Sequence, residues 1–502
     1  MNMLLNPTGL SEDQKQAVNE ISGILGISLS EDGIPVDIIK KECLEYGFDG
    51  EKGYIYYRHD HQFIRGIGIF CEYLKSGQRF CVSETPSYEK LGVMVDCSRN
   101  AVINMDAFKK LVRHLALMGY SSIQLYTEDT YEIKEYPYFG YKRGRYTTEE
   151  FHEMDDYAHL FSMELIPCIQ TLAHSGRIFQ WRAFSEVHDC YDILLADDER
   201  TYKLIDSMFS TMSKNLKSRR INIGMDEANM LGRGRYLDKF GYKDSKEIML
   251  RHLNRVMEIA RSYGYKPMMW SDMFFRLVSG GEYYSDEVHI SEDILNKIPK
   301  DVTLVYWDYY SQDKKTYDRM LNIHKKMSPN LMFAGGAWKW TGFSPNQYFS
   351  EKVAKIAHES CVEHGIKEIL ITAWGDNGAE CALFSILPVL QLWAELCYTN
   401  DESRLERRFL TCTGGSYNDF MRLGDATLTP DNPAPGRCGV NASKYLLYQD
   451  VLGGLFDAHI CLNSFSEHYK NSREFLNECG KRNPGWEYLF KVQSTLCYVL
   501  EL

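Results

Sequence analysis

The chain has 502 residues, of which 44% are hydrophobic and 25% are charged, and this composition predicts a folded globular protein of two or three domains. Its formal net charge of −12 argues against non-specific attraction to nucleic acid or to an anionic membrane, because both need basic surface. No apolar run of about 18 residues occurs, so no membrane-spanning helix is predicted, and the first residues lack the basic segment of a secretory signal.

The 14 cysteines are scattered singly along the chain, and no CxxC pair occurs. Several lie within apolar runs, among them Cys97, Cys168, Cys381 and Cys461. This pattern predicts reduced, buried thiols in a cytoplasmic protein, and it argues against a disulfide framework or a zinc site.

Residues 1–90 are predicted to form a small α/β domain. Helices are expected over residues 11–25 and 36–46, and strand-like runs occur at residues 53–59 and 63–70.

Residues 91–400 repeat one theme, in which a short apolar β-type run is followed by an amphipathic helical stretch. One predicted helix covers residues 106–120, and another covers 244–265, where Asp244 can cap the start and Gly264 can end the helix. Continuous apolar strands that alternate with helices indicate a parallel sheet covered on its outer face. The eight runs fit a (β/α)8 TIM barrel better than an open sheet. The sequence also has no GxGxxG or GxxxxGK[ST] motif, so it shows no phosphate-binding loop. The runs cover residues 93–98, 122–128, 164–170, 221–226, 267–272, 303–308, 330–336 and 368–374.

Residues 401–502 are predicted to be a C-terminal helical region, with helical runs at 443–459 and 488–502. The last run reaches Leu502 with no stop signal, so either the helix ends free in solvent or the chain is a shortened form.

The dipeptide Asp-Glu occurs at residues 198–199, 226–227, 286–287 and 401–402. Only Asp226-Glu227 directly follows a buried β-type run, whereas the other pairs stand in polar, turn-like or helix-starting contexts. Neighbouring side chains on a regular strand point to opposite faces, so this pair can converge on one ligand only where the strand has ended. The context predicts acid/base chemistry at Asp226-Glu227.

Acidic and aromatic residues stand where the predicted strands end, which is the end of such a barrel that carries the functional site. Carboxylates between aromatic rings are typical of a saccharide pocket, because rings stack on sugar C–H faces while acids and arginine bind hydroxyls. Each residue also has a structural interpretation, namely a tryptophan in the core, an interior histidine or an arginine in a structural ion pair. In chain order the strand ends give Asp96, Arg99, Glu128, Asp129, Gln170, His174, Asp226, Glu227, Trp270, Asp272, Trp307, Asp308, Tyr309, Trp338, Trp340, Trp374 and Asp376.

A metal-dependent hydrolase is the competing chemistry. Among the 14 histidines no HxH or HExxH motif stands at a predicted strand end, since His59-Asp60-His61 lies in the N-terminal region. The sequence therefore predicts neither a metal nor an organic cofactor.

With these motifs in order along the barrel, the chain resembles family 20 of the glycoside hydrolases, the β-N-acetylhexosaminidases. It is most similar to an intracellular-type branch in which IGMDEA on strand four is followed by GxGRY. The resemblance covers residues 91–400 strongly and the flanks weakly. The other supporting motifs are DCSRN (96–100), EDTYEI (128–133), YFGYKRGRYT (138–147), QTLAH (170–174), WSDMFFR (270–276), YWDYY (306–310), GGAWKWTGF (335–343) and TAWGDNG (372–378).

The resemblance implies an exo-acting, retaining enzyme that removes terminal β-linked GlcNAc or GalNAc from small oligosaccharides or glycoconjugates. In this family the substrate's 2-acetamido oxygen attacks C1 and gives an oxazolinium-type intermediate, so no enzymic nucleophile is needed. By resemblance, Glu227 is the general acid and then the base, and Asp226 holds the acetamido N–H.

The resemblance also assigns substrate contacts. Arg99 is expected to bind ring hydroxyls, and His174 and Asp129 are expected to tune Glu227. Tyr309 is expected to bond the acetamido oxygen, with Tyr306 and Tyr310 as alternatives. The aromatic walls and the remaining substrate contacts are expected from Trp270, Trp307, Trp338, Trp374 and Asp376.

Two motifs depart from the larger family. The segment IQTLAHSG lacks the acidic residue and the Pro-Gly that precede the histidine in many members, and strand seven carries GGAWKW in place of a Tyr-x-Asp arrangement. The contacts that distinguish GlcNAc from GalNAc therefore stay unassigned. A catalytically silent saccharide-binding barrel is the alternative from another functional class, and assembly into a homo-oligomer stays open.

Overall fold

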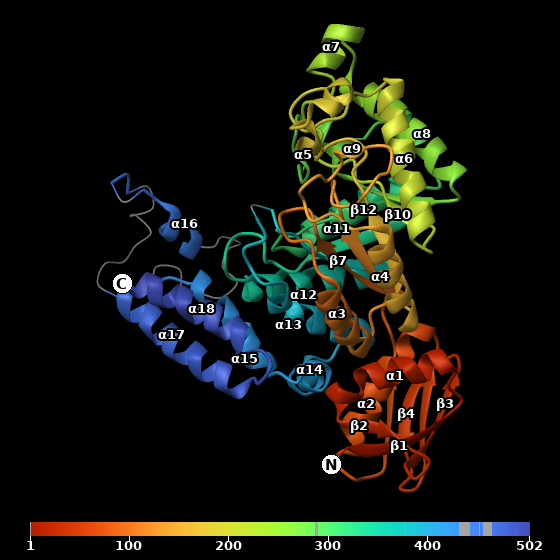
Figure 1. Cartoon of the computed structure of the whole chain (residues 1–502), viewed down its shortest axis with the longest axis vertical. Coiled ribbons are helices and arrows are strands. Elements are labelled where there is room, and N and C mark those ends of the chain that lie inside the picture. Colours follow the sequence, from red (N-terminus) through yellow and green to blue (C-terminus); the bar gives the residue numbers. More distant parts are fainter. Residues whose placement is uncertain (1, 287–289, 377, 431–441, 451, 455–463) are drawn as a thin grey trace.

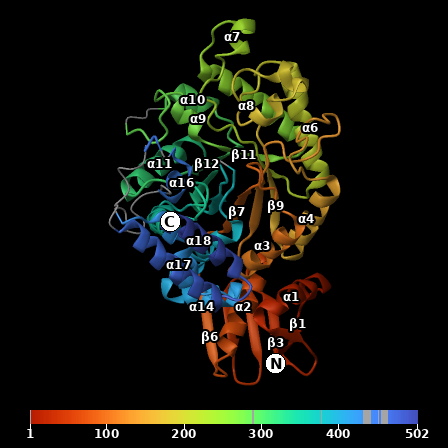
Figure 2. The ribbon, with the colours of Figure 1, turned by 60° about the vertical axis from the view of Figure 1, so that its left-hand side comes forward.

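The computed structural model describes residues 2–286, 290–376, 378–430, 442–450, 452–454 and 464–502 (Figure 1). A closed barrel of eight parallel strands forms its centre, with a small α/β domain at one end and a group of C-terminal helices along one side. Figure 2 shows that α7 (Arg235–Phe240) lies at the end of the molecule opposite the N-terminal domain. Within the described ranges, no helix is both long enough and apolar enough to cross a membrane.

The barrel confirms the predicted fold class, because every one of the eight apolar runs overlaps a strand and all the strands pair in parallel. Their order around the barrel is β10-β11-β12-β13-β14-β7-β8-β9. β10 is the shortest, and its early end matters for the site. The strands are β7 (Lys90–Asp96), β8 (Ser122–Tyr126), β9 (Glu164–Cys168), β10 (Arg220–Asn222), β11 (Lys266–Trp270), β12 (Thr303–Trp307), β13 (Leu331–Gly336) and β14 (Glu368–Ala373).

Helices cover the outside of the barrel and begin and end at the signals that the sequence provides. Asp244 caps α8 (Ser245–Ser262) by accepting a hydrogen bond from the Lys246 amide, and Gly264 follows the helix with a positive φ of 73°. The other helices of this region are α3 (Met105–Met118), α4 (Thr148–Leu160), α6 (Glu199–Asn215), α10 (Glu292–Lys297), α11 (Lys314–Met327), α12 (Gln347–Glu363) and α13 (Leu387–Tyr398), with the short α5 (Gly176–Phe179) and α9 (Asp272–Arg276).

The N-terminal domain is a six-stranded sheet in the order β2-β1-β3-β5-β4-β6, with two helices. β4 pairs antiparallel with β5 and β6, and the remaining pairs are parallel. Its elements are β1 (Met3–Thr8), α1 (Glu12–Leu25), β2 (Ile27–Leu29), β3 (Ile34–Lys40), β4 (Leu44–Phe48), β5 (Gly53–Tyr57), α2 (Phe63–Leu74) and β6 (Phe80–Glu84).

Two predictions in this domain are wrong. The helix expected over residues 36–46 is instead β3 and β4, where buried Val36 and Ile38 alternate with more exposed neighbours as the period of a strand requires. The strand expected over residues 63–70 is the helix α2, which is buried on nearly every face, and a short apolar run of this kind can be a buried strand or a buried helix. A Cβ on Gly66 of α2 would lie 2.7 Å from the Ile55 side chain, so the helix packs closely on the sheet.

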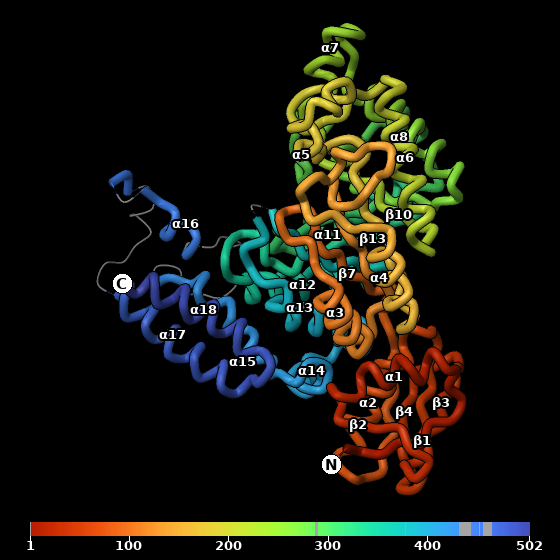
Figure 3. Tube along the Cα trace, in the orientation of Figure 1, coloured from red at the N-terminus to blue at the C-terminus, as the bar shows by residue number. Residues whose placement is uncertain are grey.

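The C-terminal region is helical, as predicted. Figure 3 shows α14 returning to the N-terminal domain, where it contacts α1 and α2. The run predicted as a helix over 443–459 contains α16, and its residues 451 and 455–459 lie outside the described part of the chain. The helices are α14 (Leu405–Thr413), α15 (Tyr417–Met421), α16 (Ala442–Tyr448), α17 (Phe465–Arg482) and α18 (Glu487–Glu501).

A buried ion cluster joins the N-terminal domain to the barrel. The Arg65 guanidinium of α2 lies 2.8 Å from Glu84 of β6 and 3.0 Å from Glu395 of α13, and all three side chains have 0% exposure. Arg408 of α14 adds a second buried guanidinium, 3.7 Å from Glu395. Because a charge left unpaired at such depth is costly, the cluster fixes how these parts dock.

Candidate active site

The chain leaves the sheet early at β10, and this early end determines how Asp226 and Glu227 are presented. After Asn222, Gly224, Met225 and Glu227 adopt positive φ values of 71°, 73° and 54°. A Cβ on Gly224 would lie 2.0 Å from the Gln170 side-chain oxygen, so only glycine fits there. The left-handed conformations break the strand alternation and let both neighbouring acids face the same space.

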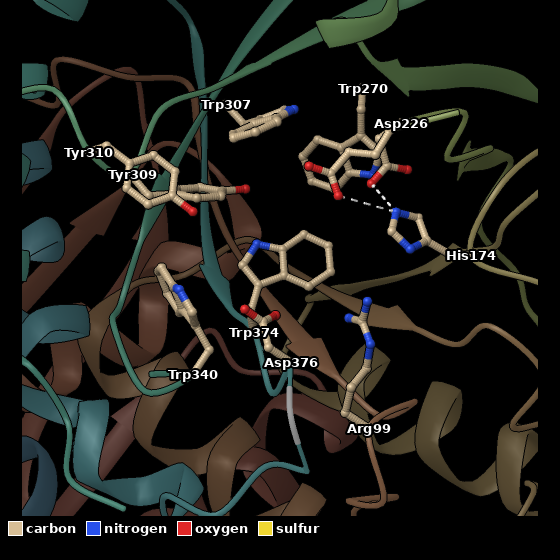
Figure 4. Close-up of a pocket in the computed structure, with 11 residues that line it drawn as sticks. Arg99, His174, Asp226, Trp270, Trp307, Tyr309, Tyr310, Trp340, Trp374 and Asp376 are labelled. Atoms are coloured by element: carbon tan, nitrogen blue, oxygen red, sulfur yellow. Dashed lines mark ion pairs between the residues drawn. The ribbon is translucent and has the colours of Figure 1, made fainter. Parts of the chain in front are cut away.

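A pocket of about 160 Å³ opens at the carboxyl-terminal ends of the barrel strands. Figure 4 shows carboxylates and a histidine on one side of it and aromatic rings on the others. Its lining comes from seven different strand ends, so the chain must close the barrel before the site exists. The lining residues are Arg99, His174, Asp226, Glu227, Trp270, Trp307, Tyr309, Tyr310, Trp340, Trp374 and Asp376.

All but two of the catalytic and substrate-contact residues that the family resemblance assigns line this pocket. Asp129 lies outside the lining, where its buried carboxylate accepts a hydrogen bond of 3.2 Å from Arg143. Trp338 also lies outside it and supports the wall, because its ring stacks on Trp340 at 4.4 Å between centroids and its N–H donates to the Tyr309 carbonyl at 2.9 Å. The lining tryptophan of this motif is therefore Trp340.

The structure places only two of the three candidate tyrosines in the pocket lining. Tyr309 and Tyr310 both line the pocket, whereas the Tyr306 hydroxyl is buried and donates to Asp308 at 2.9 Å. Which of the two lining tyrosines bonds an acetamido oxygen stays a prediction.

Asp226 is held as a carboxylate by its neighbours. The Gln170 amide donates to one of its oxygens at 2.8 Å, and His174 Nε2 lies 3.2 Å from the other. Burial alone would raise the pKa of Asp226, but the charge and hydrogen bond of His174 and the Gln170 amide outweigh it and lower the pKa below its ordinary value. Burial in turn lowers the pKa of His174, yet the charge of Asp226 prevails and raises it to about 9. The two side chains therefore form an ion pair at neutral pH.

Glu227 has the opposite environment although it is the next residue. Its carboxylate is 44% exposed and faces the pocket, with His174 Nε2 at 3.7 Å and Arg276 NH2 at 3.3 Å. Burial of the surrounding pocket and the charge of Asp226 raise the pKa of Glu227. A neighbouring pair with opposite shifts is suited to distinct acid and base roles.

Asp272 and Arg276 form an ion pair behind Glu227, and Asp272 holds the Glu227 backbone. Asp272 accepts the Glu227 amide N–H at 3.1 Å, and it also accepts a hydrogen bond from Arg276 at 2.9 Å. Burial and the charge of Asp226 raise the pKa of Asp272 to about 7. The sequence placed Asp272 at a strand end, but its contact with the Glu227 backbone depends on tertiary structure.

Arg99 is oriented into the pocket by two carboxylates. Its guanidinium lies 2.8 Å from Asp96 and 3.2 Å from Glu128. After the neighbouring strand β14, burial raises the pKa of Asp376 to about 6. Both side chains line the pocket and can form hydrogen bonds with a polar ligand.

His174 obtains an acidic partner from a distant part of the chain. The His174 amide donates to Asp192 at 3.2 Å, and its Nδ1 lies 3.8 Å from the same carboxylate oxygen. His174 itself has a positive φ of 55°. Asp192 therefore supplies the acid that the motif IQTLAHSG lacks, and sequence reasoning missed it because it lies 18 residues away in a loop.

His174, Asp226 and Glu227 are the described residues that could hold a metal ion, because one ligand atom from each lies within 4.8 Å of the others. A metal needs the neutral imidazole. Since His174 is protonated at neutral pH and paired with Asp226, the cluster is better suited to proton transfer and charge stabilisation.

Two models of known protein families match parts of this chain. Residues 88–329 match the model of the glycosyl hydrolase family 20 catalytic domain, and residues 418–502 match the model of the glycoside hydrolase 20C C-terminal domain. Among curated proteins, the chain is 23% identical to hexosaminidase D of Bos taurus over 302 residues, which span 54% of this chain and 80% of that protein.

Solved structures share the fold. An exo-β-N-acetylglucosaminidase from Vibrio harveyi, solved with N-acetylglucosamine, superposes with a TM-score of 0.62 at 15% identity over 84% of this chain and 74% of that one. A chitobiase from Flavobacterium johnsoniae gives a TM-score of 0.61 at 14% identity over 100% of this chain and 88% of that one.

Proposed function

This chain belongs to glycoside hydrolase family 20, the β-N-acetylhexosaminidases, and we propose that it is an exo-acting, retaining enzyme that removes terminal β-linked GlcNAc or GalNAc by substrate-assisted catalysis. The observation that carries the proposal is the asymmetry of Asp226 and Glu227. Asp226 is ion-paired with His174 at 3.2 Å, whereas Glu227 faces the pocket and has a raised pKa. One acid is kept charged and the other is kept ready to donate a proton.

The first step divides the work between these two acids. Glu227 donates its proton to the glycosidic oxygen while the bond from C1 to that oxygen breaks, and the 2-acetamido oxygen bonds to C1. Asp226 accepts the acetamido N–H and balances the positive charge of the oxazolinium ring. In the second step the Glu227 carboxylate takes a proton from water as the water oxygen bonds to C1, which reopens the ring and retains the configuration.

A continuous aromatic surface supports the binding of a sugar in this pocket. The rings of Trp270 and Trp374 lie 5.8 Å apart between centroids, Trp307 stacks on Tyr309 at 5.3 Å, and Tyr309 meets Trp340 at 5.5 Å. Such rings cover the C–H faces of a pyranose and the acetamido methyl group, and Arg99 and Asp376 are available for the ring hydroxyls.

The replacement Glu227→Gln tests the acid. We expect kcat to fall by about 10²–10⁴-fold on a β-GlcNAc glycoside with a poor leaving group, and by less on an activated aryl glycoside that needs little protonation. Glu199→Gln is the matched control, because Glu199 belongs to another Asp-Glu pair and its side chain is 77% exposed at the start of α6. Full activity of Glu227→Gln would contradict the assignment.

The alternative is a catalytically silent saccharide-binding barrel. Incubation of the wild-type protein with a chromogenic β-GlcNAc substrate distinguishes the two functions. Saturable binding without release of the chromophore would favour the binding protein, whereas release supports the enzyme. A β-GalNAc substrate run beside it measures the preference between the two sugars.

The cysteines support the cytoplasmic location proposed from the sequence. Every cysteine of the described residues is a free thiol, including the buried Cys97, Cys168 and Cys381, while Cys461 lies outside the described ranges.

A further inference from the structure

A second hollow of about 660 Å³ lies beside the pocket, and we call it the β10–β11 groove. It is formed by the loops that follow these two strands and by the start of α8. Its lining residues are Asn229, Arg233, Tyr242, Asp244, Ser245, Lys246, Met273, Arg276, Leu277, Gly280 and Gly281.

Glu227 forms the border between the pocket and the groove. It lines the pocket, and its Oε1 lies 3.3 Å from NH2 of Arg276, which lines the groove. Asn229, another groove residue, donates its backbone N–H to the Glu227 carbonyl at 2.7 Å. A general acid protonates the oxygen that joins the cleaved sugar to its leaving group, so the leaving group must lie beside Glu227, which borders this groove.

The groove carries more positive than negative charge. Arg233, Lys246 and Arg276 line it together with a single carboxylate, Asp244. The Asp244 carboxylate already has partners within the protein, because it caps α8 and lies 3.5 Å from the Lys246 ammonium group. Arg233 donates to the Lys243 carbonyl at 3.3 Å, and within the described part of the chain it has no carboxylate partner.

Two features of the groove point to a ligand and not only to fold stability. Lys246 stands in the first turn of α8, where the helix dipole disfavours a cation. Tyr242 is 70% exposed, and the Arg233 guanidinium lies 4.9 Å above its ring. A cationic groove with an exposed aromatic ring suits a sugar ring that carries a negative group.

We propose that the β10–β11 groove is the acceptor subsite and that it selects leaving sugars carrying a carboxylate or a sulfate. The inference rests on the proposed hydrolase function, because it defines the leaving group relative to Glu227. Arg276 connects the two sites, since it contacts Glu227 on one side and borders the groove on the other.

Matched disaccharides test the proposal. GlcNAc-β-(1→4)-glucuronate and GlcNAc-β-(1→4)-glucose differ only at C6 of the leaving sugar, and a glucose 6-sulfate acceptor separates sulfate from carboxylate recognition. We expect kcat/KM of the wild-type enzyme to favour at least one anionic acceptor by about tenfold, and the preference to shrink as ionic strength rises.

Variants identify the residues responsible. Lys246→Gln and Arg233→Gln should each lower the ratio of kcat/KM for the anionic and neutral acceptors by about threefold, and Lys246→Glu should lower it further. Lys266→Gln is the matched control, because Lys266 is exposed at the amino end of β11, the opposite end of the barrel, and this variant should leave the ratio unchanged. Should Arg233→Gln fail to fold, the two Lys246 variants carry the test.

Equal kcat/KM for neutral and both anionic acceptors would overturn the proposal, as would an equal loss on all acceptors in the Lys246 variants. An enzyme that cleaves a small chromogenic β-GlcNAc glycoside but shows no acceptor preference refutes this inference alone. A protein that cleaves none of these substrates refutes the proposed function and this inference with it.

Discussion

Replacement of His174 by glutamine removes the charge that holds Asp226 ionised while keeping a hydrogen-bond donor. The pKa of His174 rises from 6.5 to about 9, mainly through Asp226, which overcomes the effect of burial. That difference corresponds to about 3 kcal/mol of net favourable interaction for the charged imidazole. Since the attraction between the two charges is mutual, its loss leaves burial to raise the pKa of Asp226.

The pH dependence of kcat/KM on a chromogenic β-GlcNAc substrate measures this effect. Asp226 must be ionised to act in the proposed mechanism, so activity appears as pH rises through its pKa, and His174→Gln should move this acidic limb to higher pH. His188→Gln is the control, because His188 packs on Phe179 and bonds the Tyr191 carbonyl away from the acids. An acidic limb that stays in place in His174→Gln would refute the reasoning.

Three further predictions follow from the same structure. The alkaline limb of the wild-type profile should belong to Glu227: burial and the charge of Asp226 raise its pKa above that of an ordinary glutamate, activity falls as pH rises through that pKa, and the limb should disappear in Glu227→Gln. Trp374→Ala should raise KM for β-GlcNAc glycosides by about tenfold with a smaller change in kcat, measured by steady-state kinetics, because it removes an aromatic ring that lines the pocket. Glu395→Gln should lower the free energy of unfolding by about 3–5 kcal/mol in urea titrations, since it removes the carboxylate that Arg65 and Arg408 share and leaves the buried cluster with an uncompensated positive charge, whereas Glu467→Gln on α17 should have little effect.

The barrel and most of its pocket could be predicted from the sequence because both depend on local patterns. Eight apolar runs alternate with amphipathic helices, and the residues that follow each run meet at one end once the strands pair in parallel. The residues around each Asp-Glu pair also distinguished Asp226-Glu227 from the other three pairs. Asp198 and Asp401 cap α6 and a short 3₁₀ helix, while Glu287 lies outside the described residues.

The misses have physical causes. Residues 63–70 belong to a helix buried on nearly every face, and a short apolar run in the sequence is compatible with either a buried helix or a buried strand. Arg276 contacts Glu227 only because the segments after β10 and β11 converge, and Asp192 contacts His174 only because the long connection after β9 folds back on itself. Trp338 and Trp340 stand two residues apart in one motif, and only the geometry of their loop decides which ring lines the pocket.

The central claim is that the substrate provides its own nucleophile while Asp226 and Glu227 assist it. A series of aryl β-glycosides with acetamido, fluoroacetamido, difluoroacetamido and trifluoroacetamido groups at C2 tests this claim directly, because each fluorine withdraws electrons from the attacking oxygen. We predict that kcat falls steadily along the series and that the plain β-glucoside is nearly inert. Equal kcat for all members, with comparable turnover of the glucoside, would contradict the account and point to a nucleophile supplied by the protein.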